Sequence, residues 1–121
     1  MSLMDVANAL VDGCRNGKET ANLEVLYAPD AVSVEAMDHG EGREAVGMDA
    51  LRGKHAWWDA NFEVLSGDIS DPFPHGDDRF AVIFELRTRH KQSGEESDMK
   101  EVAVYHVADG KIVREEFFYG E

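Results

Sequence analysis

Apolar residues near the start of the chain recur at the spacing of an amphipathic helix. They stand at offsets of 3, 4, 7, 8 and 11 residues from Leu3, which places them on one helical face. This face consists of Leu3, Val6, Ala7, Leu10, Val11 and Cys14. Asn16-Gly17 is expected to end the helix. A shorter helix is predicted from about Lys18 to Tyr27, because Pro29 disfavours helical geometry in the residue before it.

Beyond this predicted helical hairpin, the pattern alternates before it returns to helical spacing. Ala31 to Met37 alternates between apolar and polar residues, which predicts a strand with Ser33 and Glu35 on the same face. The glycine-punctuated segment from Asp38 to Gly47 is expected to be a turn region that includes at most a short strand. A third amphipathic helix, ending near Asn61, is indicated by the recurrence of Met48, Leu51, His55, Trp58 and Phe62.

The rest of the chain has the two-residue period of β-structure. Four long strands are predicted, from Phe62 to Ser70, Arg79 to Lys91, Ser97 to Ala108 and Lys111 to Tyr119. Asp109-Gly110 lies between two apolar runs and predicts a two-residue hairpin turn. Helices followed by an antiparallel sheet indicate an α+β fold, with the helices covering one sheet face. The length of 121 residues, 43% of them hydrophobic, fits a single domain over residues 1–121.

The amino-acid composition argues against some binding partners and favours one cellular compartment. With 25 acidic and 12 basic residues the formal charge is -13, which disfavours binding to nucleic acid or to an anionic membrane. Cys14 is the single cysteine, so no internal disulfide forms, and a reducing, cytoplasmic location is expected. Asp5 and Asp12 interrupt the first apolar stretch, which therefore predicts neither a signal peptide nor a membrane span.

Several segments together resemble one known superfamily. They are the helical hairpin, Tyr27-Ala28-Pro29-Asp30-Ala31, a third helix with Trp58, and the closing segment from Glu101 to Tyr119 with its Asp109-Gly110-Lys111-Ile112 hairpin. This arrangement resembles the nuclear transport factor 2-like superfamily, and within it the SnoaL-like branch related to polyketide cyclases and steroid isomerases. The resemblance implies a cone-shaped barrel, in which a strongly curved, mainly antiparallel sheet wraps around three N-terminal helices and leaves a pocket.

The resemblance also implies a catalytic base. Matching the chain to the steroid-isomerase pattern from Tyr27 onward places Glu35 at the position of that enzyme's carboxylate base. The two oxyanion-hole donors of the isomerase fall approximately at Val11 and Ala103, which have no side-chain donor. Steroid isomerisation by that mechanism is therefore not expected.

The same register turns further side chains toward the pocket. Glu101 and Glu115 join Glu35 as candidate catalytic carboxylates, and a pocket shared by several carboxylates should keep one protonated and another ionised. Candidate substrate-binding residues are Tyr105, Tyr119, Phe117, Trp58, Phe84, Leu86, Met99 and His55. Two alternatives stay open: Glu101 and Glu115 pair with Arg or Lys or reach solvent at the mouth of the cone, and Tyr105 and Tyr119 only pack.

Metal and cofactor sites have little support in the sequence. The five histidines, among them His39 and His55, form no His-x-x-x-His pair, so no metal is expected, although His39 and His55 could line the pocket entrance. The segment from Gly40 to Ala45 matches the spacing of a dinucleotide fingerprint, but two glutamates lie in it and no alternating strands and helices surround it. We expect no cofactor.

The expected partners are a small organic molecule and a second copy of the chain. On the outer sheet face Ile83, Val102 and Val104 form an apolar cluster among charged residues, and the superfamily commonly dimerises through that face. A monomer with a solvated sheet is the alternative. The predicted function is cofactor-independent acid and base catalysis by an isomerase, cyclase or lyase that acts on a carbonyl or polyketide-like compound. The alternative function is a non-catalytic ligand-binding or dimerisation module of the same fold.

Overall fold

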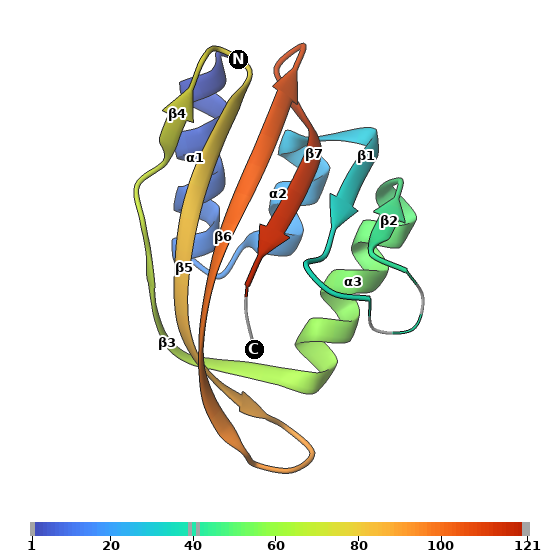
Figure 1. The fold of residues 1–121 in the computed structure, drawn as a ribbon, viewed down its shortest axis with the longest axis vertical. Helices are drawn as coiled ribbons and strands as arrows, with labels where there is room; N and C mark the ends of the chain where they lie inside the picture. Colours follow the sequence, from blue (N-terminus) through green and yellow to red (C-terminus); the bar gives the residue numbers. More distant parts are fainter. Residues whose placement is uncertain (1, 39, 41, 120–121) are drawn as a thin grey trace.

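The computed structural model describes residues 2–38, 40 and 42–119 of the chain. Helices lie against one side of a curled sheet, and the long β5–β6 hairpin extends beyond them (Figure 1). The helices are Leu3–Arg15 (α1), Glu19–Leu26 (α2) and Met48–Asn61 (α3). The strands are Tyr27–Val34 (β1), Glu44–Val46 (β2), Phe62–Ile69 (β3), Phe73–His75 (β4), Arg79–His90 (β5), Glu96–Ala108 (β6) and Lys111–Phe118 (β7).

Local signals account for the first helix and its packing. The Ser2 hydroxyl accepts a hydrogen bond from the Asp5 backbone N–H, while the Asp5 carboxylate accepts one from the Ser2 N–H, forming a capping box. The predicted apolar face is buried against the sheet and α2, with Cys14 half-buried at its edge. At the end of α1, Gly13 allows the side chain of Asn22 on α2 to come close.

The sheet has the order β2-β1-β7-β6-β5-β3, with β4 paired to β5. All neighbouring strands are antiparallel except β1 and β7, which are parallel. Asp109 and Gly110, both with positive φ (52° and 75°), connect β6 to β7, as a type I′ hairpin requires. The sheet is curled but stays open, because β2 and β3 are its two edges.

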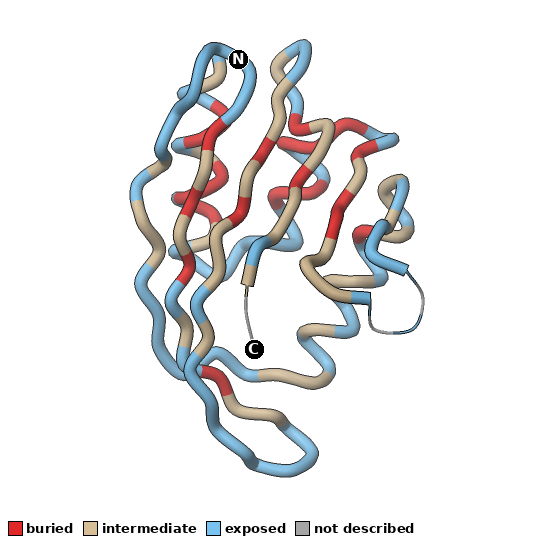
Figure 2. Tube along the Cα trace, in the orientation of Figure 1, coloured by how far each residue is buried: buried red, intermediate tan, exposed pale blue. Residues whose placement is uncertain are grey.

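The core lies between the helices and the concave face of the sheet. Figure 2 shows buried residues concentrated where α1 and α2 lie behind the sheet, whereas the far end of the β5–β6 hairpin is mostly exposed. The sheet contributes Phe80, Val82, Ala103 and Ile112, which are almost fully buried. Helix α3 buries Leu51 at its start and becomes more exposed toward its end.

The predicted fold class is confirmed, while two details of the strand prediction were wrong. The first strand runs from Tyr27, directly after α2, to Val34, instead of from Ala31 to Met37; a register shift between Tyr27 and Val32 accommodates Pro29 inside it. Strand β4 was not predicted at all. Within the described residues, no helix is both long and apolar enough to cross a bilayer.

Candidate functional site

Glu115 of β7 is a buried carboxylate on the concave face of the sheet. Its side chain lies beside Tyr105 of the neighbouring strand β6, and the residue is only 4% exposed. One carboxylate oxygen accepts a short hydrogen bond from the Tyr27 hydroxyl, and the other accepts one of 2.7 Å from Ser33 Oγ. Both donors come from β1, which pairs with β7, so the sheet register itself places them.

Glu35 follows the last residue of β1 and lies nearer to solvent. Its Oε1 is 2.6 Å from Lys54 Nζ of α3, and its Oε2 accepts a hydrogen bond of 3.1 Å from the Tyr119 hydroxyl. The Glu35 and Lys54 side chains are 29% and 26% exposed, so solvent reaches both.

Lys54 joins the two glutamates into one network. Its Nζ also donates to Ser33 Oγ at 2.7 Å, and it lies 5.3 Å from the centre of the Phe117 ring. A continuous series of hydrogen bonds therefore runs from Tyr119 through Glu35, Lys54 and Ser33 to Glu115.

Glu101 of β6 is the third carboxylate of the cluster. Among the described residues its side chain forms no hydrogen bond and no salt bridge. Burial raises its pKa to about 7, and repulsion by the charges of Glu35 and Glu115 adds to the rise, while Lys54 lowers the pKa by less. Glu101 can therefore hold or release a proton near neutral pH.

The phenols and the thiol near the cluster stay protonated. Burial raises the pKa values of Tyr27 and Tyr105 well above the ordinary value for tyrosine, with the Glu115 charge as the second cause. Tyr119 has a pKa raised to about 12 by burial and by Glu35. The pKa of Cys14 rises to about 12 through burial, the charge of Glu19 and that of Glu115, so its thiol is a poor nucleophile.

The structure brings only some of the predicted substrate-binding residues to this cluster. Tyr119 and Phe117 contact it directly, while Tyr105 is buried beside Glu115 and stacks on Phe80 with ring centres 5.0 Å apart. Phe84 is buried opposite Glu101 on the neighbouring strand. His55 is half-buried on α3, next to Lys54.

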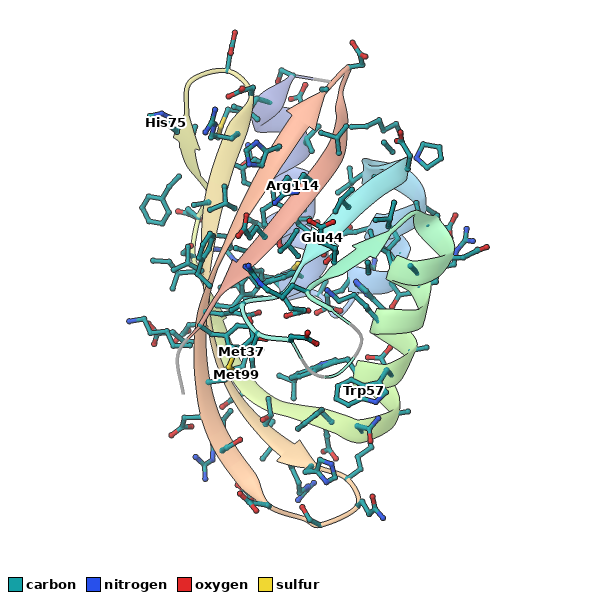
Figure 3. All side chains as sticks on the ribbon, turned by 45° about the vertical axis from the view of Figure 1, so that its right-hand side comes forward. Met37, Glu44, Trp57, His75, Met99 and Arg114 are labelled. Carbon is teal, nitrogen blue, oxygen red and sulfur yellow. The ribbon has the colours of Figure 1, made fainter. Side chains whose placement is uncertain are left out.

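Of the remaining predicted residues, Leu86 and Met99 lie farther along the β5–β6 hairpin, and Trp58 lies on α3. Met99 and Leu86 are paired across β5 and β6, and Figure 3 shows Met99 with Met37 on the side of the sheet that faces α3. Trp58 stacks on Phe62 with ring centres 4.5 Å apart, and Trp57, also labelled in Figure 3, is 61% exposed.

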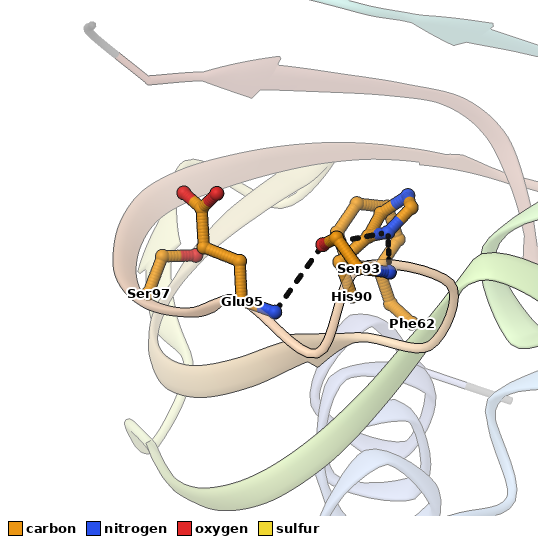
Figure 4. Close-up of a pocket in the computed structure, with 5 residues that line it drawn as sticks. All are labelled: Phe62, His90, Ser93, Glu95 and Ser97. Carbon is orange, nitrogen blue, oxygen red and sulfur yellow. Dashed lines mark hydrogen bonds between the residues drawn. The ribbon is translucent and has the colours of Figure 1, made fainter.

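Two surface hollows lie along this hairpin, and neither is lined by Glu35, Glu101 or Glu115. One of about 270 Å³, drawn in Figure 4, is lined by Phe62, His90, Ser93, Glu95 and Ser97. In it His90 Nδ1 accepts the Ser93 backbone N–H at 3.3 Å. The other, of about 560 Å³, includes Leu86 and Met99 among charged residues. We locate the candidate site at the carboxylates because hydrogen bonds and shifted pKa values converge there, whereas the hollows hold no such cluster.

The described residues contain no group of three or more His, Cys, Asp or Glu side chains placed to hold a metal ion. His39 lies outside the described residues. In the segment with fingerprint spacing, the Gly40 and Gly42 amides both donate to Asp38 Oδ1, at 2.7 and 2.9 Å. These glycines thus close a loop around a carboxylate of their own chain.

Sequence reasoning missed three members of the network: Tyr27, Ser33 and Lys54. A signal for two of them existed. Ser33 alternates with Glu35 on one strand face, and Lys54 lies three residues after Leu51 and four before Trp58, on the apolar side of its helix. One alternative was that Glu101 and Glu115 pair with Arg or Lys. In the structure a lysine, Lys54, pairs with Glu35 instead.

Comparison with known proteins gives one family match over most of the chain. Residues 7–115 match the model of the SnoaL-like domain. A Mesorhizobium loti protein of solved structure, named as a SnoaL-like polyketide cyclase and also as a carbohydrate phosphatase, is 34% identical, with a TM-score of 0.91 over 98% of this chain and all of the other. No curated protein matches significantly.

More distant structures share the fold. A Catenulispora acidiphila protein with a ketosteroid isomerase-like fold is 19% identical, with a TM-score of 0.73 over 95% of this chain and 85% of the other. A Xanthomonas campestris protein with a cystatin-like fold is 21% identical, with a TM-score of 0.78 over 100% and 92%.

Proposed function

Because this chain belongs to the SnoaL-like family, we propose that it is a cofactor-independent acid and base catalyst that acts on a small carbonyl or polyketide-like compound. The reaction class is isomerisation, cyclisation or elimination. The Mesorhizobium loti relative, named as a polyketide cyclase, supports the carbonyl substrate class.

The observation that carries the proposal is the contrast between two neighbouring carboxylates. Glu35 is ion-paired with Lys54, which favours its ionised form, whereas Glu101 has a pKa of about 7 and no hydrogen-bond partner among the described residues. One cluster therefore contains a base and a proton donor at neutral pH, which suits proton transfer at a carbon next to a carbonyl.

The roles follow from this contrast. The Glu35 carboxylate removes the proton from the carbon, and the C–H electron pair forms the carbon–carbon double bond of an enol. Glu101 donates its proton to the carbonyl oxygen, so no free enolate charge develops. The enol O–H proton then returns to Glu101 as the carbonyl re-forms. The released electron pair takes up the Glu35 proton at another carbon, attacks a second carbonyl whose oxygen accepts that proton, or expels a leaving group that accepts it. Glu115 has both oxygens occupied by the hydroxyl donors of Tyr27 and Ser33, so we assign it a structural role and not that of the acid.

Proton exchange tests the chemistry before the natural substrate is known. Wild-type protein in D₂O should accelerate α-deuteration of at least one ketone among 2-tetralone, acetylacetone and 3-cyclohexenone, as followed by proton NMR. Glu35→Gln should lower that rate about 10²- to 10⁴-fold, the usual contribution of a positioned base. The matched control is Glu24→Gln on α2, which breaks an exposed ion pair with Arg52 of α3 and should keep the full rate.

The same experiment can favour the non-catalytic alternative. The specific observation on its side is that Val11 and Ala103 cannot supply an oxyanion hole. A ketone that binds by saturation-transfer NMR but exchanges no faster than in buffer, with wild type and Glu35→Gln alike, would show a binding module and contradict the catalytic proposal.

A further inference from the structure

We propose that Lys54 is the positioning residue of the site: it fixes the direction of every hydrogen bond between Glu35 and Glu115 and so assigns the mobile proton to Glu101. The catalytic role of Lys54 in this inference rests on the proposed function. The network it describes is a property of the folded protein and can be measured without a substrate.

The ammonium group of Lys54 restricts its neighbours because it can only donate hydrogen bonds. Lys54 Nζ has hydrogen-bond donors and no acceptor, and they point to Glu35 Oε1, to Ser33 Oγ and toward the face of Phe117. Ser33 Oγ accepts a hydrogen bond from Lys54, so the hydroxyl hydrogen of Ser33 must point to a different acceptor. Glu115 Oε2, 2.7 Å away, is that acceptor. Lys54 therefore turns the Ser33 hydroxyl into a donor to Glu115.

The directions of the remaining hydrogen bonds follow from the same limits on donors and acceptors. The Tyr27 hydroxyl donates to the second oxygen of Glu115, and the Tyr119 hydroxyl donates to the second oxygen of Glu35. Both phenols keep their protons because their pKa values are raised. Glu35 and Glu115 thus act as acceptors at both oxygens, as ionised carboxylates do. Glu101, which accepts no hydrogen bond from the described residues, is the carboxylate left to bind a proton.

Without the Lys54 ammonium group, a proton should bind to Glu35 more readily than it does in the wild type. Without Lys54, Ser33 is no longer held as a donor, and Glu35 loses its counter-charge beside two other carboxylates. Like charges at short range favour protonation of one of them, so Glu35 should take up a proton at a pH where it is ionised in the wild type. A protonated Glu35 cannot act as base, and activity should then appear only at higher pH.

The test is a titration by carbon-13 NMR of protein labelled at the glutamate carboxyl carbon, with resonances assigned from Glu35→Gln and Glu101→Gln. Lys54→Met should raise the apparent pKa values of the Glu35 and Glu101 pair by one unit or more, about a tenfold change in proton affinity. Lys54→Arg, which keeps the cation, should restore wild-type values. Ser33→Ala removes the link to Glu115 with little change in volume and should shift the same resonances in a correctly folded protein.

The control is Arg52→Met, which removes another cation of α3 whose partners Glu24 and Asp49 face solvent. It should leave the Glu35 and Glu101 titrations unchanged. The proposal is overturned if Lys54→Met and Ser33→Ala also leave them unchanged, or if Lys54→Met keeps the wild-type pH profile of ketone exchange. Shifted titrations in a protein that exchanges no ketone would support the positioning role and reject the proposed function.

Discussion

Glu101 links protonation to stability, because its carboxyl group is easier to bury neutral than charged. Its pKa in the folded protein is about 7, against an ordinary value of 4.5. Between these two pH values the folded state binds more protons than the unfolded state. The contribution of Glu101 to the free energy of unfolding should therefore be highest below about pH 4.5. It should fall as the pH rises to 7 and level off above that pH.

Glu101→Gln should remove this pH dependence. At pH 8 the variant avoids burying a charge, so we expect it to be more stable than the wild type by roughly 1–3 kcal/mol. At pH 4.5 the advantage should have largely disappeared. Urea unfolding at both pH values measures the difference, with the exposed strand residue Glu44 changed to Gln as control. Equal stability of Glu101→Gln and wild type at pH 8 would contradict the raised pKa.

The candidate residues could be predicted from the sequence only in part. Strand alternation and the family resemblance together placed Glu35, Glu101 and Glu115 on one face, and the structure brings them into one cluster. Lys54 was missed because a charged residue on a helix is usually assigned to the solvent side. Lys54 instead lies on the apolar side of α3, and its long aliphatic chain carries the ammonium group from the helix to the sheet.

The contact between helices α1 and α2 at Gly13 outweighs the low helix propensity of glycine. Alanine normally stabilises a helix interior relative to glycine by about 1 kcal/mol. At position 13, however, a Cβ would lie 2.3 Å from Asn22 Oδ1, where α1 meets α2. Asn22 also donates a hydrogen bond of 3.2 Å to the Leu10 carbonyl, so its side chain is not free to move away.

Two alanine substitutions should therefore act in opposite directions. Gly13→Ala should destabilise the protein by about 1–3 kcal/mol through overpacking. Gly53→Ala in α3, where the new Cβ would have no atom within 4 Å apart from its chain neighbours and the adjacent backbone of its own helix, should stabilise it by about 0.5–1 kcal/mol. Urea unfolding of both variants provides the comparison. A stabilised Gly13→Ala would show that α1 and α2 pack less closely than described.

Element boundaries could be predicted where the signal is local. The Asp109-Gly110 turn and the long strands beside it were predicted to within about a residue, because turn chemistry and alternation are properties of adjacent residues. Strand β4 is three residues long and contains Pro74, so it has neither enough alternation nor a full set of donors to be recognised. Its pairing with β5 is a tertiary effect.

At the scale of the whole molecule, we propose that two copies associate through the convex sheet face. Val102 pairs across the sheet with Ile83 on one side and Phe118 on the other, and Phe118 is 50% exposed. Residues of both charge signs, such as Lys100 and Glu85, border this row. A patch with an apolar centre and both charge signs at its rim suits a two-fold interface with a second copy.

Val104→Asp should give a folded monomer. Burying an uncompensated carboxylate at the centre of the interface should weaken association by about 3 kcal/mol or more. Sedimentation velocity at micromolar concentration should show a dimer for the wild type and half that mass for the variant. Val64→Asp, which changes an exposed apolar residue on edge strand β3, should remain dimeric. A wild type that sediments as a monomer rejects the interface.

The parallel pairing of β1 with β7 also determines when the site can form during protein synthesis. Strands β5, β6 and β7 pair with their neighbours in the sequence, but the hydrogen-bond partners across β1 and β7 are 82 to 88 residues apart. Contacts over such separations form late in folding. On the ribosome, Tyr27, Ser33 and Glu35 must emerge long before Glu115 and Tyr119. We therefore expect a nascent chain that still lacks β7 to show a loosely packed N-terminal half, in which the hydroxyl groups of β1 remain bound to water.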